Sequence, residues 1–120
     1  MLFRSAQLGG AQILSDTQGV DFNPYLQRVL FSIRRNWYVS MPEIARMGKK
    51  GRVVIQFEIL KEGNVPKLWL VGSSQSDPLD KAALASISAS NPFQPLPTEF
   101  KGPLLRLQIM FLYNIPLDQR

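Results

Sequence analysis

Apolar residues alternate with other residues near the end of the chain, and this pattern predicts a closing β-strand. Five apolar side chains occupy every second position there: Leu105, Leu107, Ile109, Phe111 and Tyr113. In an extended strand they share one face, while the other face starts polar, with Arg106 and Gln108, and then turns apolar. Pro103 precedes the run and Pro116 prevents its regular continuation. We therefore expect a strand over residues 104–114 with one apolar and one mixed face.

An earlier stretch alternates in the same way and predicts a β-hairpin. Over residues 52–60 one face would carry four apolar side chains, which are Val53, Ile55, Phe57 and Ile59. Gly63 and Asn64 follow, and both residue types tolerate the positive φ of a tight turn. Residues 65–73 then resume an extended path, with Pro66 at the start, where a missing donor is tolerated.

Two other stretches carry apolar residues at helical spacing. The first has Tyr25, Val29, Ile33 and Trp37 at four-residue intervals, and the second has Leu79, Ala83 and Ile87. A helix-start signal precedes each stretch, Asn23-Pro24 in one case and Asp77-Pro78 in the other. The spacing predicts helices over residues 24–37 and from 77 to about 89.

The order of these elements, helix-strand-strand-helix-strand, predicts an α+β domain of two layers. Three strands form an antiparallel sheet, and both helices cover its apolar face. With the first two strands joined as a hairpin, the last strand pairs beside the first and becomes an edge of the sheet. We expect the domain to span residues 21–115, with a flexible lead-in over 1–20 that holds at most one short strand, and a tail over 116–120.

Composition excludes several classes of function. The chain has 120 residues, which suits one domain, and neither cysteine nor histidine. Thiol chemistry and imidazole acid–base catalysis are therefore absent, the acids show no paired arrangement, and we expect neither an enzyme nor a metal or other cofactor. The net charge of +5 comes from basic residues scattered along the chain, a pattern that disfavours nucleic-acid binding. No apolar run approaches the ~20 residues of a membrane-spanning helix.

Five segments in this order resemble one known family. They are the helical residues 25–37, the strand Gly51-Arg-Val-Val-Ile-Gln-Phe-Glu-Ile59, Leu70-Val-Gly-Ser-Ser74, Leu79-Asp-Lys-Ala-Ala83 with Asn91-Pro-Phe-Gln-Pro95, and Leu107-Gln-Ile-Met-Phe-Leu-Tyr113. The set is similar to the C-terminal domain of the TonB/TolA family of envelope energy transducers, over about residues 21–115. The chain lacks the cysteine pair common in TolA domains, whereas Pro92 to Pro97 resembles TolA endings, so the TonB-versus-TolA division stays open.

The resemblance implies a periplasmic domain of an inner-membrane-anchored protein in a Gram-negative bacterium. Such a protein would draw on the proton-motive force through a proton-channel complex, contacted by an amino-terminal region that this chain lacks. A TonB-like domain would bind the TonB box, a peptide at the amino end of an outer-membrane transporter, by strand addition to its last strand. A TolA-like domain would instead engage TolB-type partners and support envelope integrity.

The candidate binding site is accordingly the outer edge of the closing strand. An edge presents free amides and carbonyls that an extended peptide can satisfy as an added strand. The residues expected to contact the partner are Leu104, Arg106, Gln108, Met110, Leu112 and Asn114. Arg106 and Gln108 would supply selectivity, and Met110 and Leu112 an apolar grip.

Two alternatives concern the same edge. Two copies of the chain could pair edge to edge as a homodimer, which would make the domain a self-associating structural module. Residues 11–15 could also form an extra strand that covers the edge or swaps between copies, although Gly9-Gly10 and Gly19 flank this short apolar run.

Overall fold

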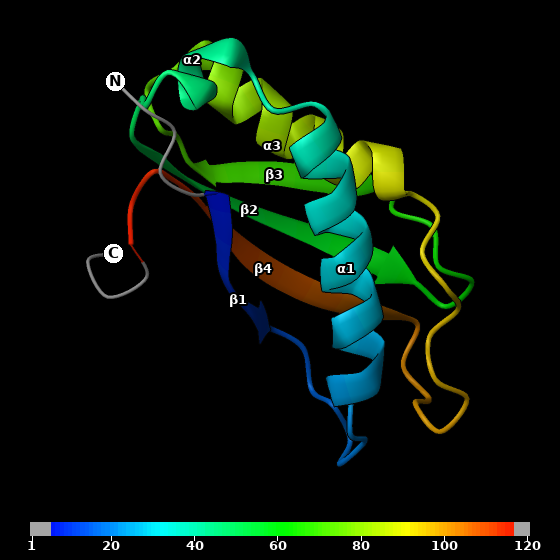
Figure 1. Ribbon diagram of the computed structural model, residues 1–120. Helices are drawn as coiled ribbons and strands as arrows, with labels where there is room; N and C mark the ends of the chain where they lie inside the picture. The colour runs from blue at the N-terminus through cyan, green and yellow to red at the C-terminus, as the bar shows by residue number, and fades with distance from the viewer. Residues whose placement is uncertain (1–5, 117–120) are drawn as a thin grey trace.

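The computed structural model describes residues 6–116, and in it seven elements follow one another along the chain. They are β1 (Ala6–Ile13), α1 (Asn23–Val39), α2 (Glu43–Arg46), β2 (Gly51–Leu60), β3 (Lys67–Gly72), α3 (Asp77–Ser90) and β4 (Leu104–Tyr113). Figure 1 shows two layers, with α1 and α3 on one face of the sheet. The expected α+β class, both helices and the hairpin are therefore present. None of the described helices is long and apolar enough to cross a membrane.

The sheet of the described residues has four strands, and the prediction of three was wrong. The strand order is β1-β4-β2-β3, and every pairing is antiparallel. The added strand, β1, comes from the segment expected to be a lead-in, and it lies beside β4 (Figure 1). Its apolar residues alternate only on either side of Gly9-Gly10, where the register shifts, so the pattern is interrupted in the sequence. Residues 1–5 and 117–120 of the predicted lead-in and tail lie outside the described residues.

The helix-facing side of the sheet forms the core. The four-residue stripe of α1 is fully or almost fully buried, and Val53, Ile55, Leu107 and Ile109 are 0% exposed beneath the helices. Burying each such aliphatic side chain stabilises the fold by about 1.5–3 kcal/mol. Both helix starts agree with the sequence, but the Asn23 side chain does not cap α1. The Asp21 carboxylate instead accepts the Asn23 amide hydrogen at 3.0 Å.

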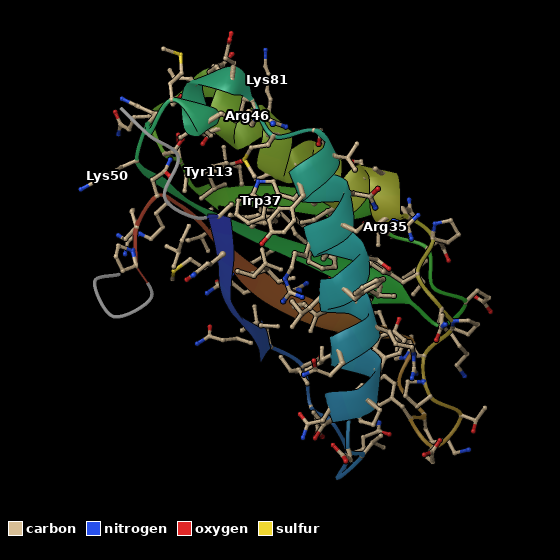
Figure 2. The ribbon with its side chains drawn as sticks, in the orientation of Figure 1. Arg35, Trp37, Arg46, Lys50, Lys81 and Tyr113 are labelled. Atoms are coloured by element: carbon tan, nitrogen blue, oxygen red, sulfur yellow. The ribbon has the colours of Figure 1, made fainter. Side chains whose placement is uncertain are left out.

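Three elements meet at one buried hydrogen-bond chain. The indole Nε1 of Trp37 in α1 donates to the Tyr113 hydroxyl in β4 at 2.8 Å, and this hydroxyl donates to the carbonyl of Leu79 in α3 at 2.8 Å. Figure 2 shows Trp37 and Tyr113 together between α1 and the sheet. Burial raises the pKa of Tyr113 well above its ordinary value, although the bond from Trp37 opposes the shift. This hydrogen-bond chain fixes the end of β4 to both helices.

The proline-rich segment after α3 packs against the hairpin turn. The Phe93 amide donates to the Gly63 carbonyl at 2.9 Å, and the Leu96 amide donates to the Lys61 carbonyl at 2.9 Å. Gly63 has φ of +104°, and a Cβ there would lie 2.1 Å from the Phe93 carbonyl oxygen. Glycine is therefore required at this turn by conformation and by close backbone approach.

Candidate functional site

The predicted binding edge belongs to an interior strand. On one side β4 pairs with β2 in unbroken register, from Leu60↔Leu104 to Gly51↔Tyr113. On its other side β4 pairs with β1, from Ile13↔Leu107 to Ala6↔Tyr113. The expectation of a free edge at β4 was therefore wrong, because β1 already satisfies the amides and carbonyls that β4 would present. The outer side of β4 is thus occupied by an antiparallel strand of the same chain.

The six predicted site residues occupy different environments. Arg106, Gln108 and Met110 lie on the sheet face opposite the helices and keep some exposure, whereas Leu112 is fully buried. Leu104 is half-buried, opposite Leu60. Met110 occupies the space above Gly9, where a Cβ would lie 3.2 Å from its Sδ. The structure therefore groups Arg106, Gln108 and Met110 as an accessible side-chain row.

Asn114 ends β4 and fixes the strand to the α2 region. Its side-chain Nδ2 donates to the carbonyls of Ala45 at 2.9 Å and Lys49 at 2.8 Å, and its φ is +58°. Asparagine tolerates this left-handed conformation better than most residues. The residue is fully buried, so this amide serves the fold.

β1 is held less regularly than β2. Its register shifts between Leu8 and Ala11, and Gly10 has φ of +112°. Of its side chains only Ala6 is buried, whereas the other apolar ones are partly buried. A bulge leaves a residue unpaired and disrupts the ladder locally. The pairing of β4 with β1 is thus weaker than its pairing with β2.

Contacts at both ends of β1 keep it in place. At one end the Tyr38 hydroxyl of α1 donates to the Ala6 carbonyl at 2.9 Å. At the other end the Arg106 amide donates to Ser15 Oγ at 2.8 Å, and the Leu14 amide donates to the Arg106 carbonyl at 2.8 Å. These bonds set what an incoming strand must replace.

The open face of the sheet carries a row of glutamines across three strands. Gln56 Nε2 donates to Gln108 Oε1 at 2.8 Å, and Gln108 Nε2 donates to Gln12 Oε1 at 3.0 Å. Beside this row, the Arg106 guanidinium forms an ion pair with Glu58. The same guanidinium lies 5.5 Å from the centroid of the Trp69 ring. The polar side chains at the β4 edge are therefore oriented by their neighbours on β2 and β3.

The opposite edge of the sheet, at β3, is protected against strand addition. β3 has six residues, begins with Lys67 after Pro66, and its register against β2 shifts between Val54 and Ile55. Short length, lysine, proline and bulges are features that prevent edge-to-edge pairing. The β3 edge is therefore a poor candidate for a binding strand.

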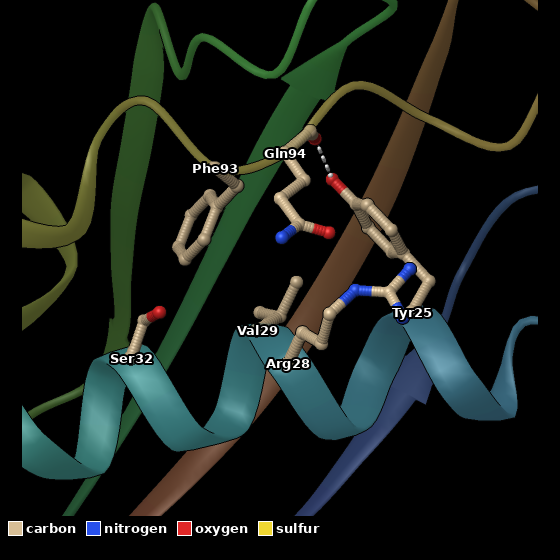
Figure 3. Close-up of a pocket in the computed structure, with 6 residues that line it drawn as sticks. All are labelled: Tyr25, Arg28, Val29, Ser32, Phe93 and Gln94. Atoms are coloured by element: carbon tan, nitrogen blue, oxygen red, sulfur yellow. Dashed lines mark hydrogen bonds between the residues drawn. The ribbon is translucent and has the colours of Figure 1, made fainter.

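Two cavities among the described residues lie beside α1. Figure 3 shows one of about 50 Å³ between α1 and the proline-rich segment, where the Tyr25 hydroxyl donates to the Gln94 carbonyl at 2.8 Å. Burial raises the pKa of Tyr25 to about 12, although the nearby Arg28 opposes the shift. A second cavity of about 290 Å³ is lined by Ser32, Arg35, Asn36, Ala89 and Ser90. Neither cavity is lined by a carboxylate, and residues 6–116 contain no metal-ligand cluster.

A buried carboxylate near the start of α3 also serves the fold. Asp80 accepts hydrogen bonds from the Ser73 hydroxyl and from the amide and hydroxyl of Ser74. Burial by itself would raise the pKa of Asp80, but these hydrogen bonds to the ionised form hold it below its ordinary value of 3.8. These hydrogen bonds link the segment after β3 to α3.

Sequence reasoning missed Gln12, Gln56 and Tyr38, which take part in the pairing at this edge. Gln12 and Gln56 both stand at polar positions of alternating segments, a signal for a shared sheet face. Only the register between β1, β4 and β2 identifies them as neighbours of Gln108. Tyr38 follows the buried Trp37 and shows no pattern of its own.

Comparisons with known proteins agree with this geometry. Residues 41–115 match the family model described as Gram-negative bacterial TonB protein C-terminal, a span that includes α2, β2, β3, α3 and β4. The solution structure of the TonB C-terminal domain from Helicobacter pylori is similar, with 29% sequence identity and a TM-score of 0.61. The similarity covers 85% of this chain and 94% of that one. A search of curated proteins gives no significant match.

Proposed function

The chain belongs to the family of C-terminal domains of Gram-negative TonB proteins, and from this premise we propose that it binds the TonB box of outer-membrane transporters. The bound peptide would lie along β4 as an added strand, in the place that β1 occupies. The domain would act in the periplasm as part of an inner-membrane-anchored transducer, with a proton-channel complex supplying force through segments outside this chain. The force would drive active uptake by the transporter.

The observation that carries the proposal is the unequal pairing of β4. Its ladder with β2 is unbroken over the whole strand, whereas its ladder with β1 contains the Gly9-Gly10 bulge. A peptide that offers a regular strand can therefore replace the irregular one without disturbing the rest of the sheet. Because the backbone makes most of the bonds in strand addition, transporters with different sequences could share the site.

The position of β4 also suits a strand that bears load. A pull along the axis of an added strand is shared by all hydrogen bonds of the ladder at once. The Tyr113 hydroxyl passes the load from β4 to α1 and α3 through Trp37 and the Leu79 carbonyl. Tension that arrives from the amino-terminal side would act first on β1, and would thereby favour uncovering of the edge.

Both matches are to TonB proteins, which favours a TonB-like role over the TolA-like alternative with TolB-type partners. Self-association through β4 itself requires β1 to leave β4 in two copies at once. The β3 edge does not offer an easier route, because Pro66, Lys67 and its bulge oppose pairing. Peptide binding needs only one such displacement.

The test is a nuclear magnetic resonance titration of the full chain with transporter amino-terminal peptides. We expect the amides of Leu104–Tyr113 to shift, and the amides of β1 to move towards values of an unpaired strand. A control peptide with proline at a central position whose N–H would face β4 lacks a ladder bond and should shift the β4 amides less at the same concentration. Unmoved β4 amides with every transporter peptide would reject strand addition, and a tight dimer insensitive to peptide would support self-pairing instead.

A further inference from the structure

The glutamine row orients one donor towards the β4 edge. Gln56 Nε2 donates to Gln108 Oε1 at 2.8 Å, so the carbonyl end of the Gln108 amide points to β2. The amide nitrogen of Gln108 then points to β1, where it donates to Gln12 Oε1 at 3.0 Å. Rotating the Gln108 amide would place its NH₂ group against the NH₂ group of Gln56. Gln56 therefore holds Gln108 as a donor at the binding edge.

The register shows that this donor faces a single position of the neighbouring strand. Gln12, Gln108 and Gln56 are direct partners across β1, β4 and β2, so their side chains share the open face of the sheet. Gln108 is half-buried and Gln12 is exposed. When β1 leaves, Gln108 keeps its bond to Gln56 but loses its acceptor.

From this arrangement we infer that Gln108 selects the side chain of the incoming strand. The residue opposite Gln108 should be glutamine or glutamate, because both reach as far as Gln12 and both present an oxygen acceptor. A leucine at that position offers no acceptor to this donor. Gln108 is thus a specificity-determining residue and Gln56 its positioning residue, and the inference rests on the proposed strand addition.

The other positions of β1 show why selection concentrates at this one. Ala6, Leu8, Ala11 and Ile13 lie opposite Tyr113, Phe111, Ile109 and Leu107, all on the side of the helices. On the open face, Gln7 lies opposite Leu112, and its Oε1 has no hydrogen-bond partner among the described residues. Gln7 and Gln12 therefore form a matched pair of glutamines, one without and one with a polar partner on β4.

The experiment uses a synthetic peptide that copies β1, residues 6–15 of this chain (AQLGGAQILS), titrated against the full chain. The chain's own β1 competes equally with every peptide, so the ratio of two peptide affinities is independent of this competition. Replacing Gln12 by leucine in the peptide should weaken binding about fivefold, the value of one ordinary hydrogen bond. Replacing Gln12 by glutamate should preserve binding. Replacing Gln7 by leucine is the control and should not weaken it.

Protein variants assign the effect to its residues. In the Gln108→Leu protein the parent and the Gln12→Leu peptides should bind equally, as a double-mutant cycle requires for a direct contact. In the Gln56→Leu protein the difference between the two peptides should shrink, because the Gln108 amide is then free to rotate. Gln56→Glu should not restore this difference, because a carboxylate only accepts, so the Gln108 amide nitrogen turns to β2 and its oxygen faces the peptide.

The outcomes separate the two proposals. Binding at β4 without discrimination at Gln12, or discrimination that persists in the Gln108→Leu protein, overturns the selection by Gln108 and leaves strand addition standing. Failure of all β1-derived and transporter peptides to move the β4 amides overturns both. A fivefold loss that depends on Gln108 supports both.

Discussion

The Trp37 indole and the Tyr113 hydroxyl meet at 2.8 Å, seventy-six positions apart in the sequence, and their rings lie edge to face at 5.0 Å between centroids. Tyr113 also donates to the Leu79 carbonyl. One hydroxyl therefore joins the strand proposed to bind the transporter to both helices. The contact fixes the inner face of β4 to α1 and α3 independently of the strand on its outer side.

Removing this hydroxyl should weaken the whole domain. Tyr113→Phe leaves the Trp37 Nε1 donor and the Leu79 carbonyl without this partner in the core, at a cost of about 1–3 kcal/mol. Urea unfolding measures the loss as a lower midpoint at unchanged slope. Tyr38→Phe is the control, because the Tyr38 side chain is about half exposed, and it should cost the global fold less. Equal losses in the two variants would contradict the role given to Tyr113.

The Tyr38→Phe variant should also differ from the parent in peptide binding. Tyr38→Phe removes the bond from α1 to the Ala6 carbonyl, so β1 should leave β4 more readily. Peptides that replace β1 should then bind severalfold more tightly, because displacing β1 from β4 costs less free energy. Hydrogen exchange should show faster exchange of the β1 amides and little change in β2. Unchanged peptide affinity together with faster β1 exchange would show that β1 does not compete for the site.

Stability should fall in acid through Asp80. Its pKa is lower in the folded chain than the ordinary 3.8, so the unfolded chain binds the proton more readily. The stabilisation is complete above the unfolded value and is lost as pH falls through the lower folded value. Asp80→Asn should therefore be less stable than the parent at neutral pH, and the difference should narrow below pH 3.8. Unfolding curves at several pH values measure the difference in stability between the parent and Asp80→Asn. A difference that stays constant with pH would contradict the lowered pKa of Asp80.

Glycine at the hairpin turn should be necessary for a reason beyond φ. Gly63→Ala brings a Cβ against the Phe93 carbonyl, whereas Gly19→Ala, at φ of +76°, meets nothing within 4 Å. The Gly19→Ala control should lower the free energy of unfolding only by the strain of a positive φ, about 1 kcal/mol. Gly63→Ala should lower it clearly more. Thermal unfolding of the two variants compares them, and equal costs would show that the close approach is relieved without penalty.

Much of this fold was predictable because its signals are local. The alternation over β2 and β4, the four-residue stripes of α1 and α3 and the turn at Gly63 each specify an element within a few residues. The sequence indicates β1 only as the alternative of a strand over residues 11–15, because Gly9-Gly10 interrupts its alternation and because a bulged strand gains its pairing from the distant β4. The edge status of β4 depends on that pairing, so the sequence predicts the strand itself but places it at a free edge.

The side-chain part of the site was less predictable for a similar reason. Arg106 and Gln108 could be assigned to the open face from alternation alone. The orientation of the Gln108 amide depends on Gln56, fifty-two positions earlier, and its acceptor is Gln12, ninety-six positions earlier. Such contacts follow from register across strands, which local patterns do not encode.

The most direct test of the account is to prevent β1 from leaving. The chain has no cysteine, so Gln12→Cys with Gln108→Cys introduces a single pair at direct strand partners, where Cα separations suit a disulfide. Oxidised and reduced forms of this protein have the same residues and differ only in whether β1 is locked. We predict that transporter peptides shift the β4 amides in the reduced form and leave them unmoved in the oxidised form. Equal binding by the two forms would contradict the claim that a transporter peptide takes the place of β1.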